Sequence, residues 1–319
     1  MEIRNTILAG LIVAGLGSAP PAQAIFVDNG VVGDGFWQVD VLAGGESRTG
    51  NLDPTGAQPT TDVIFDYFHY IDVGADGGGF RLSTTATLGP SGAGGTGGTV
   101  TSMGSFAGLN GTINWQASST IGAGSDLYLT FLEFSSSQSF GNVRLIQYLD
   151  EDVLGVSDDR LIVVGTPGMD DFQLLTVDDD NNVGVSHAAT YNTANGMTYI
   201  GWAADEFSDL RSAITGAGAS YSIAGVVDTT SLTDLGVGGD ARYPGLQAYG
   251  PEDITSAIAF DFDPDATFAS VILSLGGSPS GTPTPPPEIP RGTVPEPTSV
   301  MLFLLGLAGV GFARQRARR

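Results

Sequence analysis

VIFDYFHYIDV, residues 63–73, has the residue pattern of a β-strand. Its odd-numbered positions are apolar or aromatic except for one histidine, and a period of two residues is typical of strands. Three of the intervening positions, Ile64, Phe68 and Tyr70, are apolar as well. A strand that is apolar on both sides needs cover on both faces. The segment therefore predicts a layered β-structure.

Short strand patterns recur along much of the chain, separated by glycine, asparagine and aspartate. Glycine accounts for 47 of the 319 residues, and Asn110-Gly111 and Asn195-Gly196 are typical hairpin turns. Asp263-Pro264-Asp265 joins the last two apolar runs. Roughly a dozen short strands with tight turns predict an all-β fold, an antiparallel β-sandwich. The further strand candidates are 80–88, 127–132, 143–147, 160–166, 172–178, 197–203, 221–227, 257–263 and 267–275.

One segment has helical spacing instead. Phe207, Leu210 and Ile214 recur at helix intervals, Asp205 is expected to cap the amino end, and Gly216 is expected to end the helix. We expect one short helix that closes an end of the sandwich. The glycine-rich segment 89–98 (GPSGAGGTGG) is expected to form a flexible loop, because no lysine follows it to complete a phosphate-binding motif.

The charge balance is strongly acidic. The chain has 35 acidic residues against 12 basic ones, all of them arginine, and a net charge of −23. Nucleic acids are excluded as a general partner, because their affinity comes from lysine and arginine neutralising phosphates. Docking on anionic lipid is disfavoured for the same reason. The chain contains no cysteine, so the fold must rely on its hydrophobic core without disulfides, and thiol catalysis is excluded.

Few residues suggest catalysis, and we expect no enzyme. His69 lies in the aromatic strand, where a hydrogen-bonded structural role is expected, and Ser186-His187 is a neighbouring pair without a nucleophile elbow around it. Carboxylates are abundant in turns, so a secreted glycan hydrolase that uses two of them is the alternative. The acidic turns are Asp150-Glu151-Asp152, Asp158-Asp159 and Asp170-Asp171.

Two aspartate-rich runs are candidate calcium sites, and no other cofactor is expected. Both offer oxygen ligands at alternate positions, and plain solvated turns are the alternative that explains both runs. The first run departs from the EF-hand loop at Val183, where glycine is required, and at Ala189, where glutamate is required. The proposed ligands are Asp178, Asp180 and Asn182 in the first run, and Asp261, Asp263 and Asp265 in the second.

Each of the three tryptophans is a candidate either for glycan binding or for packing in the hydrophobic core. An exposed indole ring can stack against sugars, whereas a buried one fills the space between sheets. A core position is favoured for each of them. They are Trp37, Trp115 and Trp202.

The carboxyl end consists of Pro295-Glu296-Pro297, an apolar run and an arginine-rich tail. Residues 298–313 carry no charge, and as a helix they would extend roughly 24 Å, somewhat less than the ~30 Å hydrocarbon core of a bilayer. Arginine side chains can snorkel to the interface and extend that reach. We expect a transmembrane helix over 298–313, with the basic tail on the cytoplasmic side and the body outside. The tail arginines are Arg314, Arg316, Arg318 and Arg319.

The amino end has the pattern of a secretory signal peptide. Arg4 precedes an apolar run, residues 7–17, and Pro20-Pro21 end it. Ala22 and Ala24 are the small residues that signal peptidase needs, which predicts cleavage before Ile25.

The tail resembles the PEP-CTERM sorting signal of Gram-negative bacteria, whose motif is a Pro-Glu-Pro triplet, a transmembrane segment and an arginine-rich end. The resemblance implies recognition by an exosortase, a membrane-embedded transpeptidase, with cleavage near Pro295–Pro297. A permanent, uncut anchor is the alternative. Four segments are thus expected: a signal peptide (1–24), an acidic β-rich ectodomain (25–277), a proline-rich linker (278–294) and the sorting signal (295–319).

Two classes of function follow from this organisation. The first is an exported, non-enzymatic protein of the cell surface or extracellular matrix, processed by exosortase and associated with exopolysaccharide in a biofilm. Its precursor would be anchored transiently in the inner membrane by the C-terminal helix. The second is the glycan hydrolase with paired carboxylates.

Overall fold

The computed structural model describes residues 24–32, 35–53, 61–74, 79–151, 158–178, 183–191, 194–216, 226–227 and 232–278. The predicted signal peptide up to residue 23, the linker from residue 279 and the whole sorting signal lie outside them. All described elements belong to one compact unit, Met1–Pro286, and Pro287–Arg319 forms a second unit. Within the described residues, no helix combines the length and the apolar character needed to cross a bilayer.

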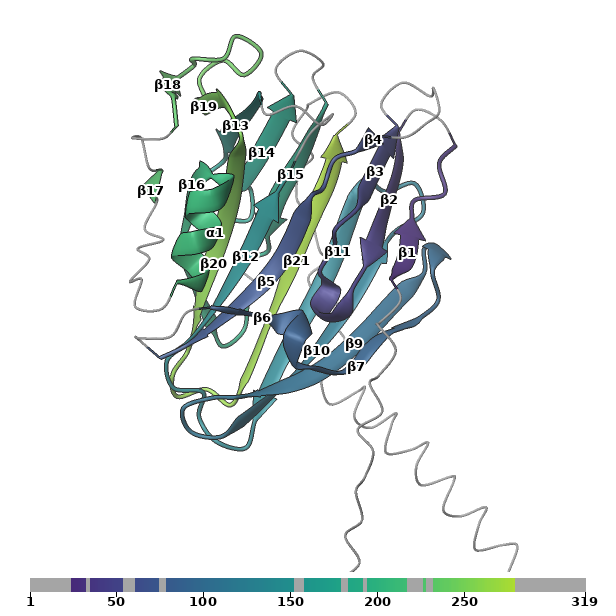
Figure 1. The fold of residues 1–319 in the computed structure, drawn as a ribbon, viewed down its shortest axis with the longest axis vertical. Helices are drawn as coiled ribbons and strands as arrows, with labels where there is room; N and C mark the ends of the chain where they lie inside the picture. Colours follow the sequence, from purple (N-terminus) through teal and green to yellow (C-terminus); the bar gives the residue numbers. More distant parts are fainter. Residues whose placement is uncertain are drawn as a thin grey trace, which may run out of the picture. The chain divides into compact units, whose positions relative to one another are not determined.

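A ten-stranded sheet forms one layer of the fold (Figure 1). Its strands β9, β10 and β11, towards one edge, are long and alternate between buried and more exposed residues, as expected of strands that pack on one face. The strands β14 and β15, nearer the centre, are buried at every position. From one edge to the other its strands are β18 (Asp234–Val237), β19 (Gln247–Glu252), β13 (Asp159–Val164), β14 (Gln173–Asp178), β15 (Gly184–Ala189), β21 (Phe268–Ser278), β11 (Leu127–Ser136), β10 (Thr112–Ile121), β9 (Thr99–Ala107) and β7 (Ala86–Gly92).

Two smaller sheets lie side by side over this layer (Figure 1). The six-stranded sheet consists of β17 (Val226–Val227), β16 (Met197–Glu206), β20 (Ile254–Phe262), β12 (Val143–Asp150), β5 (Asp66–Val73) and β6 (Phe80–Arg81). The five-stranded sheet consists of β4 (Thr61–Asp62), β3 (Gly50–Asp53), β2 (Phe36–Val41), β1 (Ile25–Asp28) and β8 (Gly95–Thr96). An isolated bridge between Ser47 and Tyr67 joins the two sheets.

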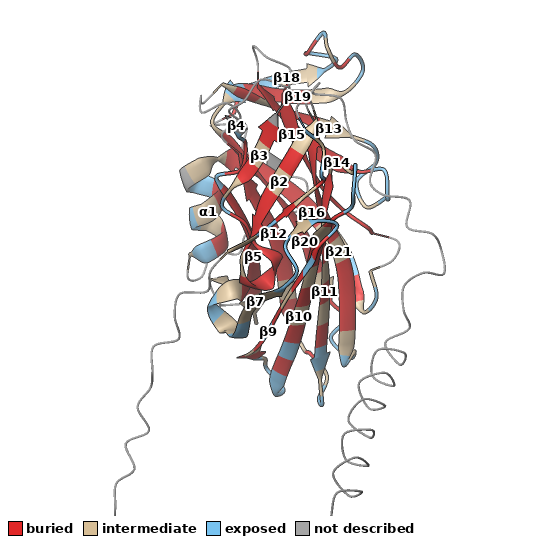
Figure 2. Ribbon diagram, turned by 90° about the vertical axis from the view of Figure 1, so that its right-hand side faces the viewer, coloured by how far each residue is buried: buried red, intermediate tan, exposed pale blue. Residues whose placement is uncertain are grey.

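The hydrophobic core fills the space between the layers. Phe134 of β11 and Phe262 of β20 meet edge to face with ring centroids 4.9 Å apart, which links the ten- and six-stranded sheets. A second cluster under the five-stranded sheet contains Trp37 and Tyr128. The strands are largely buried along this interior, whereas the outer side of the helix is exposed (Figure 2).

These features confirm the predicted antiparallel β-sandwich with one helix. All strand pairs among the described residues are antiparallel except β1 with β8 and β16 with β17. The described part contains 21 strands, more than the dozen expected. The difference comes largely from short edge strands of two to four residues, such as β4, β6 and β8, which are too short to show a period.

The opening segment 63–73 is covered on both faces, as predicted. Its strand, β5, begins at Asp66, and Tyr67 and Ile71 point into the interior clusters. Phe68 and Tyr70 point outward, where they pack with Leu210 of the helix.

The helix α1 (Phe207–Thr215) covers that outer face. Leu210 and Ile214 are buried against the six-stranded sheet, and Gly216 ends the helix by donating its N–H to Ser212 O. The expected capping role of Asp205 was wrong, because Asp205 is the penultimate residue of β16 and Glu206 occupies the N-cap position.

Several turn predictions were correct only in part. Asn110-Gly111 joins β9 to β10 as a hairpin, as expected. Asn195-Gly196 instead carries the chain from one sheet to the other, because the strands on its two sides belong to different layers. Asp263-Pro264-Asp265 joins the last two apolar runs, now β20 and β21, as expected, and also crosses between the layers. The expected strand 80–88 is interrupted by the 3₁₀ turn η2 (Leu82–Thr85), and the expected loop 89–98 contains parts of β7 and β8.

A buried 3₁₀ turn, η1 (Ala43–Gly45), connects β2 to β3 at the junction of the sheets. Gly44 and Gly45 have φ angles of 76° and 73°, in the left-handed region that favours glycine. A Cβ atom on Gly45 would collide with Thr130 Cγ2 and lie 2.7 Å from Ser119 Oγ. The turn therefore requires glycine for both its conformation and its packing.

We predict that Gly45→Ala destabilises the fold by about 2–5 kcal/mol, because left-handed strain and overpacking act together. The matched control is Gly124→Ala, since Gly124 has a similar φ of 68°. The Cβ atom that alanine adds at this position has no heavy atom of another residue within 4 Å, apart from its chain neighbours. The control should cost only about 1–2 kcal/mol. Urea unfolding measures both losses, and equal losses in the two variants would contradict the packing argument.

Candidate functional site

The η1 turn is held by side chains from the strands on either side of it. His69 Nδ1 of β5 donates to Gly44 O at 2.9 Å, and Tyr128 of β11 donates its hydroxyl to Gly45 O at 2.8 Å. The Gly44 N–H donates to Ser102 Oγ of β9 at 2.8 Å. Because β5 and the other two strands lie in opposite layers, the turn ties the sandwich together at this point.

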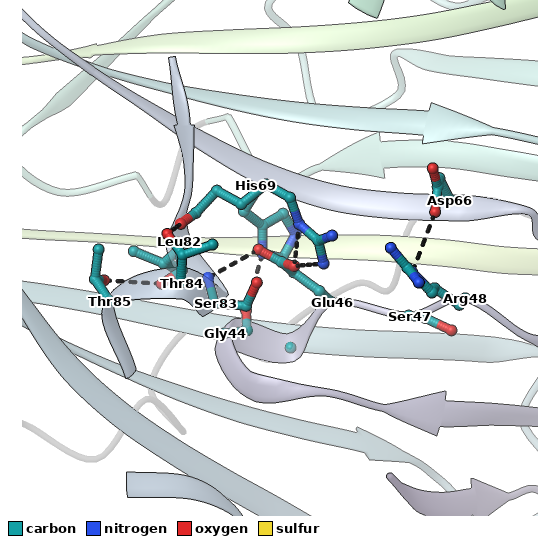
Figure 3. Close-up of polar contacts among 12 residues, drawn as sticks. Gly44, Glu46, Ser47, Arg48, Asp66, His69, Leu82, Ser83, Thr84 and Thr85 are labelled. Carbon is teal, nitrogen blue, oxygen red and sulfur yellow. Dashed lines mark hydrogen bonds and ion pairs between the residues drawn. The ribbon is translucent and has the colours of Figure 1, made fainter. Parts of the chain in front are cut away.

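A buried ion pair follows the turn directly (Figure 3). The Glu46 side chain is fully buried and accepts from Arg81 Nη2 at 2.5 Å and Nε at 3.1 Å. Its other oxygen accepts the Ser83 N–H at 3.0 Å. Burial raises the pKa of Glu46, and the Arg81 guanidinium opposes that shift. The carboxylate is thus a structural partner of η2, with all its oxygens occupied.

Three arginines gather around one phenyl ring on the outer face of β5. Their guanidinium carbons lie 3.3 Å (Arg81), 5.5 Å (Arg48) and 5.8 Å (Arg211) from the Phe68 ring centroid, within the range of cation–π attraction. Asp66 lies between two of them, 2.9 Å from Arg211 Nη1 and 3.5 Å from Arg48 Nε. Burial raises the pKa of Asp66, and the neighbouring arginines partly offset this effect.

These arginines were missed at the level of sequence. They come from residues 48, 81 and 211, which are distant in the chain and have no motif in common. The one signal available in the sequence is that basic residues are scarce, since the chain has 12 arginines and no lysine. Three arginines around one ring are therefore an unusual local concentration of positive charge.

Both histidines are buried between the layers. His69 and His187 lie on opposite sheets, and both rings contact Tyr67, with centroid distances of 4.9 Å and 6.4 Å. His187 Nδ1 shares a hydrogen bond of 3.0 Å with Ser256 Oγ. Burial lowers the pKa of His69 to about 4 and that of His187 to about 3. His69 thus has the hydrogen-bonded, buried position that its aromatic strand predicted.

The fold brings Asp150-Glu151 close to Asp159, which belongs to another of the predicted acidic turns. Glu151 is only 1% exposed, and burial together with Asp159, Asp150 and Asp253 raises its pKa well above the usual range. Asp170 and Asp171 lie in an exposed turn, and Asp152 falls outside the described residues. The carboxylates near Glu151 are therefore close to one another but buried.

The candidate calcium ligands are only partly described by the structure. Asp178 is buried at the end of β14, whereas Asp180 and Asn182 lie outside the described residues. Asp261 accepts hydrogen bonds from Arg144 at 2.7 and 3.2 Å, and Asp263 accepts the N–H of Asp265 at 3.1 Å. Across the described ranges, no three acidic or histidine side chains are grouped to hold a metal ion. Calcium binding stays a prediction.

All three tryptophans lie in the core, as favoured from the sequence. Trp37 is 0% exposed, Trp115 2% and Trp202 7%. None of them offers a ring face to a glycan.

Comparison with known proteins identifies the tail. Residues 293–319 match the PEP-CTERM protein-sorting motif, which includes Pro295-Glu296-Pro297 and the terminal arginines. The chain thus carries an export signal of a membrane-anchored precursor, and exosortase is the processing partner that the motif implies.

The ectodomain has no such match. A comparison with curated proteins finds no matching sequence. Among solved structures, the chain is similar to a bacterial glucoamylase crystallised with acarbose, with a TM-score of 0.43 and 11% identity over 82% of this chain. The chain spans about a third of the length of the glucoamylase, because the match covers 33% of the glucoamylase chain.

We predict that Arg81→Met destabilises the fold by about 3–5 kcal/mol, because it leaves Glu46 buried without its partner. The pKa of Glu46 then rises further above its value in the unfolded chain. In the variant, the folded state then keeps a proton on Glu46 that the unfolded state has released. The loss of unfolding free energy relative to the wild type therefore grows as the pH increases from about 5 to 8. Denaturant unfolding at both pH values measures this, and the double variant Glu46→Gln/Arg81→Met should recover part of the loss. A loss independent of pH would contradict the pairing.

We predict that His187 makes the fold sensitive to acid. Its folded pKa is about 3, so between pH 6 and pH 4 the unfolded chain takes up a proton that the folded chain does not. Stability should therefore fall by about 1.4 kcal/mol for each pH unit of acidification. The neutral variant His187→Gln should lack this contribution, so its unfolding free energy should have a shallower slope by that amount. Identical slopes would show that the imidazole titrates normally in the folded state.

Proposed function

We propose that this protein is a non-enzymatic component of the cell surface or extracellular matrix, delivered there through exosortase processing and associated with exopolysaccharide. The observation that carries this proposal is the PEP-CTERM sorting motif over residues 293–319. The sequence upstream is consistent with it, because a signal-like amino end and a strongly acidic body suit an exported protein.

Support for a non-enzymatic role comes from the position of the reactive groups. The two histidines and Glu151 are all buried, and a group that reacts with a glycan must reach the substrate. A glycan hydrolase would need two carboxylates about 5–10 Å apart on either side of a bound sugar. Incubating the protein with exopolysaccharide from its host and measuring new reducing ends tests the alternative, and their appearance would overturn the non-enzymatic role.

We predict that replacing Pro295, Glu296 and Pro297 with alanine blocks processing in the native host. The altered protein should stay in the membrane fraction with its carboxyl end intact, because exosortase no longer recognises the motif. Intact-mass spectrometry and cell fractionation measure this outcome. The control replaces Pro285, Pro286 and Pro287 with alanine, which removes three prolines from the same region but keeps the motif.

The control protein should be cut and released as the wild type is. If the two variants have the same mass and distribution, the motif does not direct processing. If the wild type itself keeps an uncut carboxyl end in its host, the protein is permanently anchored and the exosortase proposal fails.

A further inference from the structure

Two arginines and two phenylalanines form a partly exposed patch where the loop after η1, the start of β5 and the amino end of α1 meet. This arginine–phenylalanine patch consists of Arg48, Arg211, Phe65 and Phe207. The Phe65 and Phe207 rings meet edge to face with centroids 6.3 Å apart, and the Arg211 guanidinium lies 5.8 Å from the Phe207 centroid. Arg48 joins the patch through Asp66, which it shares with Arg211.

The arginines of this patch reach the solvent, and Asp66, the carboxylate that they share, lies beneath them. The side chain of Arg48 is 58% exposed and that of Arg211 is 35% exposed, whereas Asp66 is 4% exposed. Asp150, directly opposite Asp66 across β5 and β12, is also buried, and so is Glu46. The chain as a whole has a charge of −23, so a surface that presents guanidinium groups is distinctive.

The exposed groups are available for a ligand. Arg48 contacts Asp66 through Nε, and its two Nη atoms have no hydrogen-bond partner among the residues that the structure describes. Phe65 is 53% exposed although it is a large aromatic residue. Phe207 and Arg211 are one helical turn apart and share a side of α1, whereas the exposed Asp209 lies two residues from each and points elsewhere.

We infer that the arginine–phenylalanine patch binds a carboxylate-bearing polysaccharide, a chain of uronic-acid type. A guanidinium group pairs with a carboxylate through two parallel hydrogen bonds, and an exposed phenyl ring packs against the apolar face of a sugar ring. A uronate polymer presents both features on every sugar, so neighbouring units can engage Arg48 and Phe65 together. Repulsion from distant acidic residues is screened beyond about 8 Å at physiological ionic strength.

This inference rests on the proposed association with exopolysaccharide and names the class of glycan. Binding is measured with the protein purified from its host, using polygalacturonate as the probe and the same polymer with its carboxylates reduced as the neutral control. Poly-glutamate serves as an acidic polymer without sugar rings. The wild type should bind polygalacturonate and bind the reduced polymer at least tenfold more weakly, because hydrogen bonds to charged groups dominate the contact.

Two variants in the patch and two matched controls locate the site. Arg48→Gln should weaken binding about tenfold, since it removes the exposed guanidinium, and Phe65→Ser should weaken it about fivefold. Arg144→Gln removes another partly exposed arginine, paired with Asp261, and Phe26→Ser removes another exposed phenylalanine; both should bind as the wild type does. All four side chains are at least partly exposed, so thermal melting should show folded variants.

Each other outcome overturns the inference. Equal losses in the patch and control variants would place binding elsewhere, and equal affinity for poly-glutamate would indicate an acidic peptide as the partner. If the wild type does not bind polygalacturonate but cell fractionation still finds it in the matrix, the glycan class is wrong while the proposed function stands. If the protein is absent from the surface and matrix fractions, the proposed function itself fails.

Discussion

The buried turn at Gly44–Gly45 is the constraint around which the two layers of this fold are assembled. Its carbonyl oxygens accept from His69 and Tyr128, and its N–H donates to Ser102, so side chains from both layers converge on one piece of backbone. Polar backbone groups buried without partners cost free energy, and here they are satisfied only when both layers are in place. The turn therefore couples formation of the five-stranded sheet to the rest of the sandwich.

The same turn sets the position of the charged residues that follow it. Glu46 is buried next to η1 and needs Arg81, which brings η2 and the edge of the six-stranded sheet against it. Arg48, two residues further, remains at the surface and shares Asp66 with Arg211 of the helix. An acidic chain with 12 arginines thus places three of them around a single phenyl ring. The proposed glycan contact depends on this arrangement, since Arg48 and Arg211 reach the solvent while Asp66 and Glu46 are buried.

The sequence predicted those features that depend on local pattern. The strand around Tyr67, the Asn110-Gly111 hairpin and the helix with Leu210 and Ile214 all follow from residue spacing, and the structure contains them. Predictions failed where the structure of a segment depends on which other strand it pairs with. Asn195-Gly196 is a typical hairpin dipeptide, yet it connects strands of different sheets, because the choice of partner depends on packing and not on the turn. The arginine–phenylalanine patch could not be predicted from the sequence, because its residues are far apart in the chain.

By itself, the sequence determined the sorting signal of this protein and its structural class. The sorting motif is a short, contiguous tag that an enzyme reads as sequence, and strand periodicity is a property of neighbouring residues. Only the tertiary structure decided which polar groups are buried and which reach solvent. His69, His187 and Glu151 are enclosed, whereas Arg48 and Phe65 are exposed. Burial depends on contacts between distant segments, and such contacts leave no local pattern in the chain.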